Sequence, residues 1–128
     1  MDHLREDELQ TLRRRLEAER AAILSRAGEF VRTSADFSLD TGDRQDLAAY
    51  EAARAATQRL AMHERRRLAE VEAALARMTR GTYGICEASG DAIPFARLEI
   101  EPTARLTVEA QAEAEAEAED EAEAEGGY

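Results

Sequence analysis

Residues 44–80, RQDLAAYEAARAATQRLAMHERRRLAEVEAALARMTR, decide the fold of this chain. Small and apolar residues recur three or four positions apart, which is the period of one helix face. This stripe consists of Leu47, Tyr50, Ala53, Thr57, Leu60, Glu64, Leu68, Val71, Leu75 and Met78. Gly81 follows at the position where a left-handed C-cap ends a helix. The segment therefore predicts one helix of about 55 Å.

A second long helix is expected over residues 3–33, about 45 Å in length. Its apolar stripe consists of Leu9, Leu12, Leu16, Ile23, Ala27 and Phe30. Turn-forming residues fill the connector between the two helices, namely Ser34, Asp36, Ser38, Asp40, Thr41 and Gly42. Because neither stripe can be buried by a lone helix, residues 1–80 should pair as an antiparallel coiled-coil hairpin with its tip near 34–46. The predicted fold class is all-α.

The charge of the chain is unevenly distributed. The 128 residues carry a net charge of −11, with 35% charged residues, 5% aromatic residues and no Trp. Nine acidic and no basic residues lie between Glu109 and Glu125, so the remaining 19 acidic and 17 basic residues nearly balance. A body without basic excess is poorly suited to binding DNA phosphates. The Ala/Glu-rich tail at 112–128 should continue a helix that starts near Arg105 and then fray into disorder before Gly126.

The chain shows no apolar run long enough for a membrane span and no signal-peptide core behind its charged N-terminus. A single cysteine cannot form an internal disulfide, which suits a reducing compartment. We therefore expect a cytoplasmic protein that does not associate with membranes, and we expect it to be a monomer.

Residues 81–111, GTYGICEASGDAIPFARLEIEPTARLTVEAQ, form a different kind of segment. Turns alternate with short apolar runs that contain Ile93, Phe95, Leu98, Ile100, Leu106 and Val108. A module of about thirty residues is too small to fold alone without a metal ion or disulfide, so it must pack against the base of the hairpin.

The frame of this segment contains Tyr-Gly-x-Cys, Gly-x-x-Ile-Pro, Ala-Arg-Leu and Glu-Pro-Thr-Ala-x-Leu. It resembles the zinc finger of the DksA/TraR family of bacterial transcription regulators. The resemblance places the four zinc-ligand positions at Cys86, Ser89, Thr107 and Ala110, of which only Cys86 is a thiol. His3 and His63 lie outside the knuckle spacing, and a structural zinc requires four strong donors. We expect a degenerate finger without zinc.

We expect hydrogen bonds and apolar packing to hold this finger instead of a metal. The packed residues should be Ile85, Ile93, Leu98 and Leu106. Cys86 should then be a small buried residue rather than a reactive thiol.

The sequence Asp43-Arg-Gln-Asp46-Leu-Ala48 at the start of the second helix has two compatible interpretations. Asp43 is a natural N-cap, and Asp46 lies where acidic side chains stabilise a helix N-terminus. DksA-type proteins also carry an Asp-x-x-Asp-x-Ala motif at the coiled-coil tip, at a fixed distance before the first finger cysteine, and this chain matches that distance without a gap. A calcium loop starting at Asp36 is excluded, because Thr41 and Leu47 occupy the positions of its Gly and Glu.

The resemblance implies a function. Members of this family bind RNA polymerase without contacting DNA; their coiled coil enters the secondary channel, and their tip acts near the catalytic magnesium. It implies that Asp43, Asp46 and Ala48 form the functional tip, and it suggests Arg59, Arg66 and Arg97 as contacts to the channel rim. Members that respond to ppGpp use basic residues at positions that align with Glu70, Glu101 and Gln111 here, so we expect weak or absent ppGpp dependence.

Two alternatives stay open. Gre-type cleavage factors also carry acidic residues at a coiled-coil tip and promote transcript hydrolysis, and a plain coiled-coil adaptor would share the two long helices. No Ser/His/Asp set, Cys/His pair or glycine-rich phosphate loop is present, so we do not expect an enzyme. The run Arg65-Arg66-Arg67 is either a docking patch or, as we favour, a solvated face paired with Glu64, Glu70 and Glu72.

Overall fold

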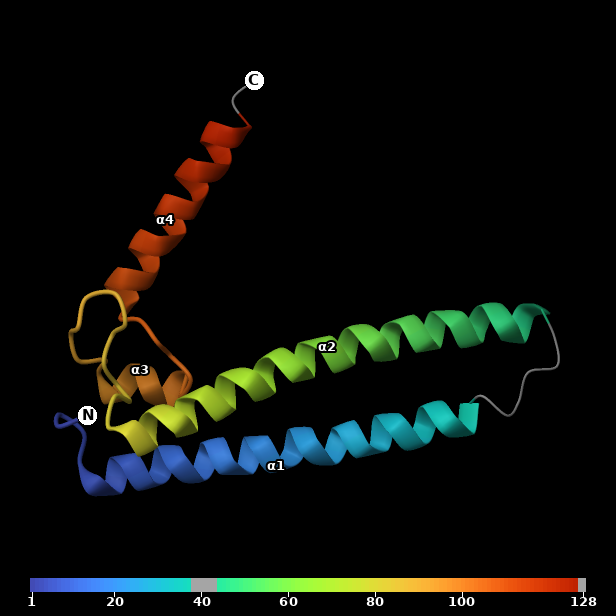
Figure 1. Ribbon diagram of the computed structural model, residues 1–128, viewed down its shortest axis with the longest axis horizontal. Helices are drawn as coiled ribbons and strands as arrows, with labels where there is room; N and C mark the ends of the chain where they lie inside the picture. The colour runs from blue at the N-terminus through green and yellow to red at the C-terminus, as the bar shows by residue number, and fades with distance from the viewer. Residues whose placement is uncertain (38–43, 127–128) are drawn as a thin grey trace.

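A computed structural model describes the backbone of residues 1–37 and 44–126, and the side chains of these residues except 28–37 and 44–46. It contains four helices, namely α1 (Glu6–Phe37), α2 (Arg44–Arg80), α3 (Phe95–Ile100) and α4 (Val108–Glu125). Figure 1 shows α1 and α2 running antiparallel as a long rod, with α3 at one end of the rod and α4 projecting away from it. The predicted all-α hairpin is confirmed. The described residues form one isolated antiparallel bridge, between Ile85 and Ala92.

The bounds of α2 agree with the prediction, and its C-terminus shows why. Gly81 adopts a positive φ of 79°. Its N–H donates to the carbonyl of Met78 at 3.4 Å, and the N–H of Thr82 donates to the carbonyl of Arg77 at 3.0 Å. This pair of bonds is the Schellman motif, which ends a helix at a residue free to adopt the left-handed conformation.

The bounds of α1 differ from the prediction. The helix begins at Glu6 instead of residue 3, with acidic residues in its first turn that favour a helix N-terminus. It continues to Phe37 and so includes Ser34 and Asp36, which we had assigned to the connector. Serine and aspartate each disfavour a helix interior by only about 0.7 kcal/mol or less, so a long helix can continue through them.

The core lies in the half of the rod next to the finger. Among the described side chains, the buried apolar residues are Leu12, Leu16 and Ile23 of α1 and Val71, Ala74 and Met78 of α2. The predicted α2 stripe is wrong towards the other end, because Leu47 and Leu60 are 46% and 49% exposed. There, the ion pair between Arg26 and Glu64, with an N–O distance of 3.0 Å, joins the helices.

The finger, residues 81–107, packs against this core through Tyr83, Ile93 and Leu98, which are fully buried. Its first loop closes through the N–H of Ile93, which donates to the carbonyl of Gly84 at 2.7 Å, and the N–H of Cys86, which donates to that of Asp91 at 2.8 Å. The imidazole Nε2 of His3 lies 2.8 Å from the carbonyl oxygen of Ile93. The N-terminal segment therefore packs on the finger.

The tail prediction was wrong in one respect. Helix α4 begins at Val108 and continues to Glu125, where we had expected disorder before Gly126. Thr107 caps its first turn, and Ala and Glu are strong helix formers. Only Ala110 of this helix is buried. No helix in the described part of the chain is long and apolar enough to cross a membrane.

Candidate functional site

The predicted tip motif lies at the start of α2, and the structure describes it in part. Asp43 lies outside the described residues, as does the side chain of Asp46. Asp46 and Ala48 belong to the first turns of α2, and Ala48 is exposed. Figure 1 shows that α2 begins at the end of the rod opposite the finger. The backbones of Asp46 and Ala48 are therefore separated from the finger by most of the length of α2, which is about 55 Å for 37 residues.

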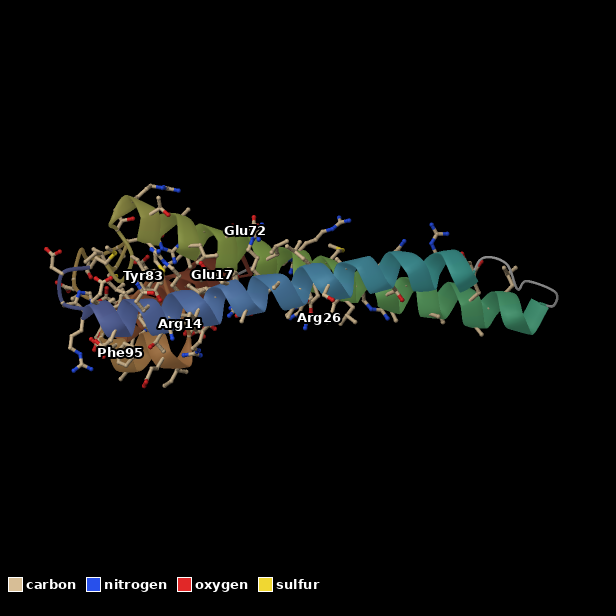
Figure 2. All side chains as sticks on the ribbon, turned by 90° about the horizontal axis from the view of Figure 1, so that it is seen from below. Arg14, Glu17, Arg26, Glu72, Tyr83 and Phe95 are labelled. Atoms are coloured by element: carbon tan, nitrogen blue, oxygen red, sulfur yellow. The ribbon has the colours of Figure 1, made fainter. Side chains whose placement is uncertain are left out.

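Two of the three arginines suggested as rim contacts are free on the surface. Arg59 and Arg66 are exposed on α2, and neither forms an ion pair with another described residue. They lie seven positions apart, so they share one helix face, and the exposed Met62 lies between them. Figure 2 places Arg26 along the rod, away from the finger end where Tyr83 and Phe95 lie.

The third arginine, Arg97, is used within the finger. Its Nε donates to the carbonyl of Leu106 at 2.8 Å, and its Nη2 donates to the side chain of Gln111 at 2.5 Å. Because these bonds hold the end of the finger and the first turn of α4, Arg97 offers a partner less of its guanidinium than Arg59 or Arg66 does.

Thr107 is linked by hydrogen bonds to two other positions assigned to zinc ligands, Cys86 and Ala110. The Thr107 N–H lies 3.4 Å from the Cys86 sulfur, and the Thr107 hydroxyl lies 3.9 Å from it. The same hydroxyl oxygen accepts the N–H of Ala110 at 3.2 Å. Cys86 is 2% exposed, as expected for a small buried residue.

The hydrogen bonds to Cys86 also change its acidity. A hydrogen bond with the Ser89 side chain lowers the pKa of the thiol, burial acts in the opposite direction, and backbone hydrogen bonds from Thr107, Ser89 and Ala88 lower it further, to about 6. Hydrogen bonding to the charged form is a general cause of such a shift.

These residues do not fit a zinc ion. Cys86 can supply one thiolate, the Thr107 hydroxyl is occupied as the cap of α4, and Ala110 has no donor atom. The Ser89 oxygen accepts the N–H of Asp91 at 3.3 Å. Among the described residues, no group of three or more His, Cys, Asp and Glu side chains could hold a metal ion. Zinc requires four strong donors in a tetrahedron, and this set supplies one.

A cleft of about 310 Å³ lies between α2 and the finger. The three positions that the resemblance linked to ppGpp, namely Glu70, Glu101 and Gln111, all line it. Two arginines line it as well, but Arg97 is bonded to Gln111, and Arg105 forms an ion pair with Glu87 at 3.1 Å. The sequence thus identified three residues that the fold brings together, and none of the three is a cation.

Arg67 is a residue that our sequence interpretation assigned only in part. That interpretation places it on a solvated face, and its ion pair with Glu70 agrees with this. It also forms ion pairs with Glu19 of α1 and Glu101 of the finger, which the sequence interpretation did not include. Its position carried a signal for this role: it lies four residues before Val71, on the face of α2 that also buries Ala74 and Met78. Of the acidic partners expected for the arginine run, Glu64 and Glu72 instead pair with Arg26 and Arg20 of α1.

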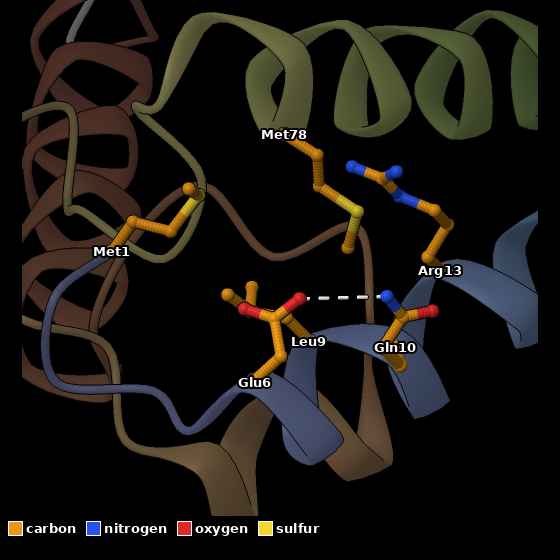
Figure 3. A pocket seen from close by; sticks show the side chains of 6 residues that line it. All are labelled: Met1, Glu6, Leu9, Gln10, Arg13 and Met78. Atoms are coloured by element: carbon orange, nitrogen blue, oxygen red, sulfur yellow. Dashed lines mark hydrogen bonds between the residues drawn. The ribbon is translucent and has the colours of Figure 1, made fainter.

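A smaller cavity, about 130 Å³, lies where the N-terminal segment meets the rod (Figure 3). It is lined by Met1, Glu6, Leu9, Gln10, Arg13 and Met78. The Gln10 amide donates to the Glu6 carboxylate at 3.5 Å across its rim. Three of the lining side chains are apolar (Met1, Leu9 and Met78) and three are polar or charged (Glu6, Gln10 and Arg13).

Comparison with known proteins identifies the family. The sequence profile described as "Prokaryotic dksA/traR C4-type zinc finger" matches residues 81–116. The RNA polymerase-binding transcription factor DksA of Caulobacter vibrioides is 34% identical over 103 residues, which cover 80% of this chain and 72% of that protein. The transcription factor DksA2 of Pseudomonas aeruginosa has a similar structure, with a TM-score of 0.82, 30% identity, and coverage of 89% of this chain and 88% of that one.

General stress protein 16O of Bacillus subtilis is 55% identical over 47 residues, which are 37% of this chain but only 29% of that longer protein. This chain therefore belongs to the DksA/TraR family.

Proposed function

We propose that this protein is a transcription regulator that binds RNA polymerase. The observation that carries the proposal is the two-helix rod with the finger at one end and the Asp-x-x-Asp-x-Ala motif at the start of α2. The similarity of the entire architecture to DksA2, a transcription factor, supports it. So does the relationship to DksA of C. vibrioides, which is described as RNA polymerase-binding.

The rod enters the secondary channel of the polymerase with its tip first. A pair of helices is narrow enough for a pore, and α2 alone provides about 55 Å of reach. Asp43 and Asp46 then lie close to the catalytic magnesium. Carboxylates held near a bound cation change the local electrostatic field, and this effect alters the lifetime of the open complex. Arg59 and Arg66 contact the rim of the channel, and Arg97 contributes less because its donors hold the finger together.

The protein does this without binding DNA and without ppGpp. Outside α4 its charges nearly balance, so it cannot gain affinity by releasing counterions from DNA phosphates. Glu70 and Glu101 repel a polyphosphate at the cleft where cations would be required. It carries no zinc, because the four ligand positions supply one thiol.

The deciding experiment measures binding to core RNA polymerase and the decay of open complexes on a ribosomal-type promoter. The variant Asp43→Asn with Asp46→Asn should still bind polymerase and should lose its effect on open-complex lifetime. The matched control, Glu123→Gln with Glu125→Gln in α4, removes two charges far from the tip and should behave as wild type. Failure of the wild-type protein to bind polymerase would contradict the proposal.

A transcript-cleavage assay on stalled elongation complexes separates this function from that of a Gre-type factor. We expect no acceleration of cleavage. DksA of C. vibrioides and DksA2 of P. aeruginosa are described as transcription factors, and no group of His, Cys, Asp and Glu that could hold a metal ion is found in the described part of the chain.

A further inference from the structure

Residues 99–103, at the end of α3 and in the turn after it, receive side-chain donors from several parts of the fold. Arg15 of α1 donates from Nη1 to the carbonyl of Glu99 at 2.6 Å. The Tyr83 hydroxyl donates to the carbonyl of Pro102 at 2.7 Å, and Arg77 of α2 donates from Nη2 to the carbonyl of Thr103 at 3.4 Å. This short segment is therefore the joint between the finger and the rod.

One arginine connects all the elements that meet at this joint. Arg67 of α2 donates through Nε and Nη2 to both carboxylate oxygens of Glu19 on α1. Its Nη1 donates to the Glu101 carboxylate at 3.0 Å and to the Thr103 hydroxyl at 3.1 Å. The planar guanidinium can bind the Glu19 carboxylate with two parallel hydrogen bonds and donate to the finger at the same time, which a lysine ammonium group could not do.

The acceptors around Arg67 are ordered among themselves. The Thr103 hydroxyl donates to the Glu101 carboxylate at 2.7 Å. The two finger groups that accept hydrogen bonds from Arg67 therefore also hold each other in place. The Glu70 carboxylate lies 3.4 Å from Nη1 and adds a third negative charge. Hydrogen bonding with Glu19 raises the pKa of Arg67, burial acts against it, and Glu101 raises it further.

The side chain of Arg67 is less exposed than those of Arg20 and Arg26, which form the pairs with Glu72 and Glu64 between α1 and α2. The Arg67 side chain is 24% exposed, whereas those of Arg20 and Glu72 are 47% and 49% exposed. Exposed ion pairs contribute little because water and salt screen them, but partly buried, bidentate pairs are stronger. Arg67 is thus the cation in the described structure that joins α1, α2 and the finger at once.

We propose that Arg67 is an ionic latch that fixes the orientation of the finger relative to the rod, and hence a positioning residue for polymerase binding. The second part rests on the proposed function, because a finger on the channel rim and a tip inside the channel must be held at one angle to each other. The first part stands on the contacts alone. A finger without a metal ion depends on such contacts for its placement.

The test of the latch is hydrogen–deuterium exchange of the full chain, followed by mass spectrometry. Arg67→Gln should accelerate exchange in peptides covering residues 95–107 by about tenfold, the factor that corresponds to losing a hydrogen-bonded charge worth about 1.4 kcal/mol. Two controls remove one positive charge each without touching the joint. Arg66→Gln changes the neighbouring exposed residue, and Arg20→Gln breaks the exposed pair with Glu72. Both should leave exchange in 95–107 unchanged.

A double-mutant cycle tests whether the finger side of the latch acts through Arg67. If it does, Arg67→Gln combined with Glu101→Gln accelerates exchange no more than Arg67→Gln alone. Arg67→Lys should restore part of the protection, because it retains the charge but not the fork. Equal exchange in wild type and Arg67→Gln, or an equal effect of Arg20→Gln, would overturn the latch.

Polymerase affinity tests positioning separately from stability. Val71→Ala removes buried apolar surface from the rod without touching the latch and provides the stability control. We expect Arg67→Gln to weaken polymerase binding about tenfold at a temperature where both variants are folded, and Val71→Ala to retain wild-type affinity. Faster exchange with unchanged affinity would overturn the positioning role and leave the regulator proposal intact. Absence of wild-type binding would contradict the proposed function and leave the exchange result standing.

Discussion

The Thr107 hydroxyl lies 3.9 Å from the Cys86 sulfur, and its oxygen accepts the N–H of Ala110. One side chain thus connects the first loop of the finger with the first turn of α4. Its two hydrogen-bond partners, Cys86 and Ala110, occupy positions at which the family resemblance places metal ligands. A short chain of hydrogen bonds therefore joins Cys86, Thr107 and Ala110.

This arrangement predicts that purified protein contains no stoichiometric zinc and that EDTA does not change its Tm. Elemental analysis and thermal unfolding monitored by circular dichroism are the measurements. The triple variant Ser89→Cys, Thr107→Cys and Ala110→Cys provides the converse, because four thiolates at these positions should bind one zinc and make the Tm sensitive to EDTA. One zinc per wild-type chain would contradict the prediction.

Thr107→Ala should destabilise the protein by about 1 kcal/mol, because the cap of α4 is lost. Thr107→Ser retains the capping oxygen and should remain close to wild type. The control is Thr79→Ala on α2, whose hydroxyl bonds to the Leu75 carbonyl inside a helix and caps nothing. Urea unfolding of the four proteins gives the comparison, and equal stability of Thr107→Ala and wild type would show that the cap contributes nothing.

The contribution of Glu101 to stability should depend on pH. Burial would raise its pKa, but hydrogen bonds from Thr103 and Arg67 outweigh burial and lower it. A group with a lowered pKa stabilises the folded state fully above its unfolded pKa, about 4.3 for Glu, and loses this effect as pH falls through the folded value. The difference in unfolding free energy between wild type and Glu101→Gln should therefore stay constant near neutral pH and shrink in acid below about pH 4.

Urea titrations across this range provide the measurement. Glu99→Gln is a suitable control, because Glu99 is exposed next to the same joint and its carboxylate forms no ion pair with another described residue. A difference between wild type and Glu101→Gln that persists unchanged into acid would mean that the Glu101 carboxylate does not bind Arg67 as an anion.

Core substitutions should show that the two halves of the rod differ in stability. Leu12 is fully buried, so Leu12→Ala should cost about 2–5 kcal/mol. Leu60 is 49% exposed, so Leu60→Ala should cost less than about 1 kcal/mol. The same substitution at both sites makes each a control for the other. Similar losses would indicate that Leu60 is buried by a contact that the described residues do not show.

Binding of ppGpp should be absent both for the free protein and for its complex with polymerase, because Glu70 and Glu101 present carboxylates to the cleft. Equilibrium binding of labelled ppGpp is the measurement. Glu70→Lys with Glu101→Arg reverses both charges, and a gain of binding in this variant would confirm that charge is the cause. Micromolar binding by the wild type would contradict the prediction.

The parts of the fold that could be predicted are those set by local sequence. The C-terminus of α2 could be predicted from Gly81, because the C-cap depends on that one glycine. The C-terminal end of α1 could not be predicted, because the low helix propensities of Ser34 and Asp36 are too small an effect to end a long helix. Leu60 and Val71 belong to the same apolar stripe, yet Val71 is buried and Leu60 is half exposed. The periodicity alone does not show which half of the rod lies next to the finger.

In the candidate site, too, some features follow from local sequence and others depend on tertiary contacts. The family resemblance assigned zinc-ligand positions to Cys86, Ser89, Thr107 and Ala110, and the fold brings Cys86, Thr107 and Ala110 together through hydrogen bonds. The role of Arg67 depends on Glu19 and Glu101, which are far from it in sequence, so only the packed structure reveals it. The carboxylates of the tip motif remain a prediction from the sequence.

Helix α4 makes the charge distribution of the molecule strongly asymmetric. It carries nine negative charges and extends for about 27 Å from the finger, whereas the rest of the chain is almost neutral. The centre of negative charge is therefore displaced towards the end of the molecule that is farthest from the start of α2 (Figure 1). A polyanion that approaches this end is repelled before contact, while one that approaches the opposite end is not, and the bias fades as salt shortens the Debye length.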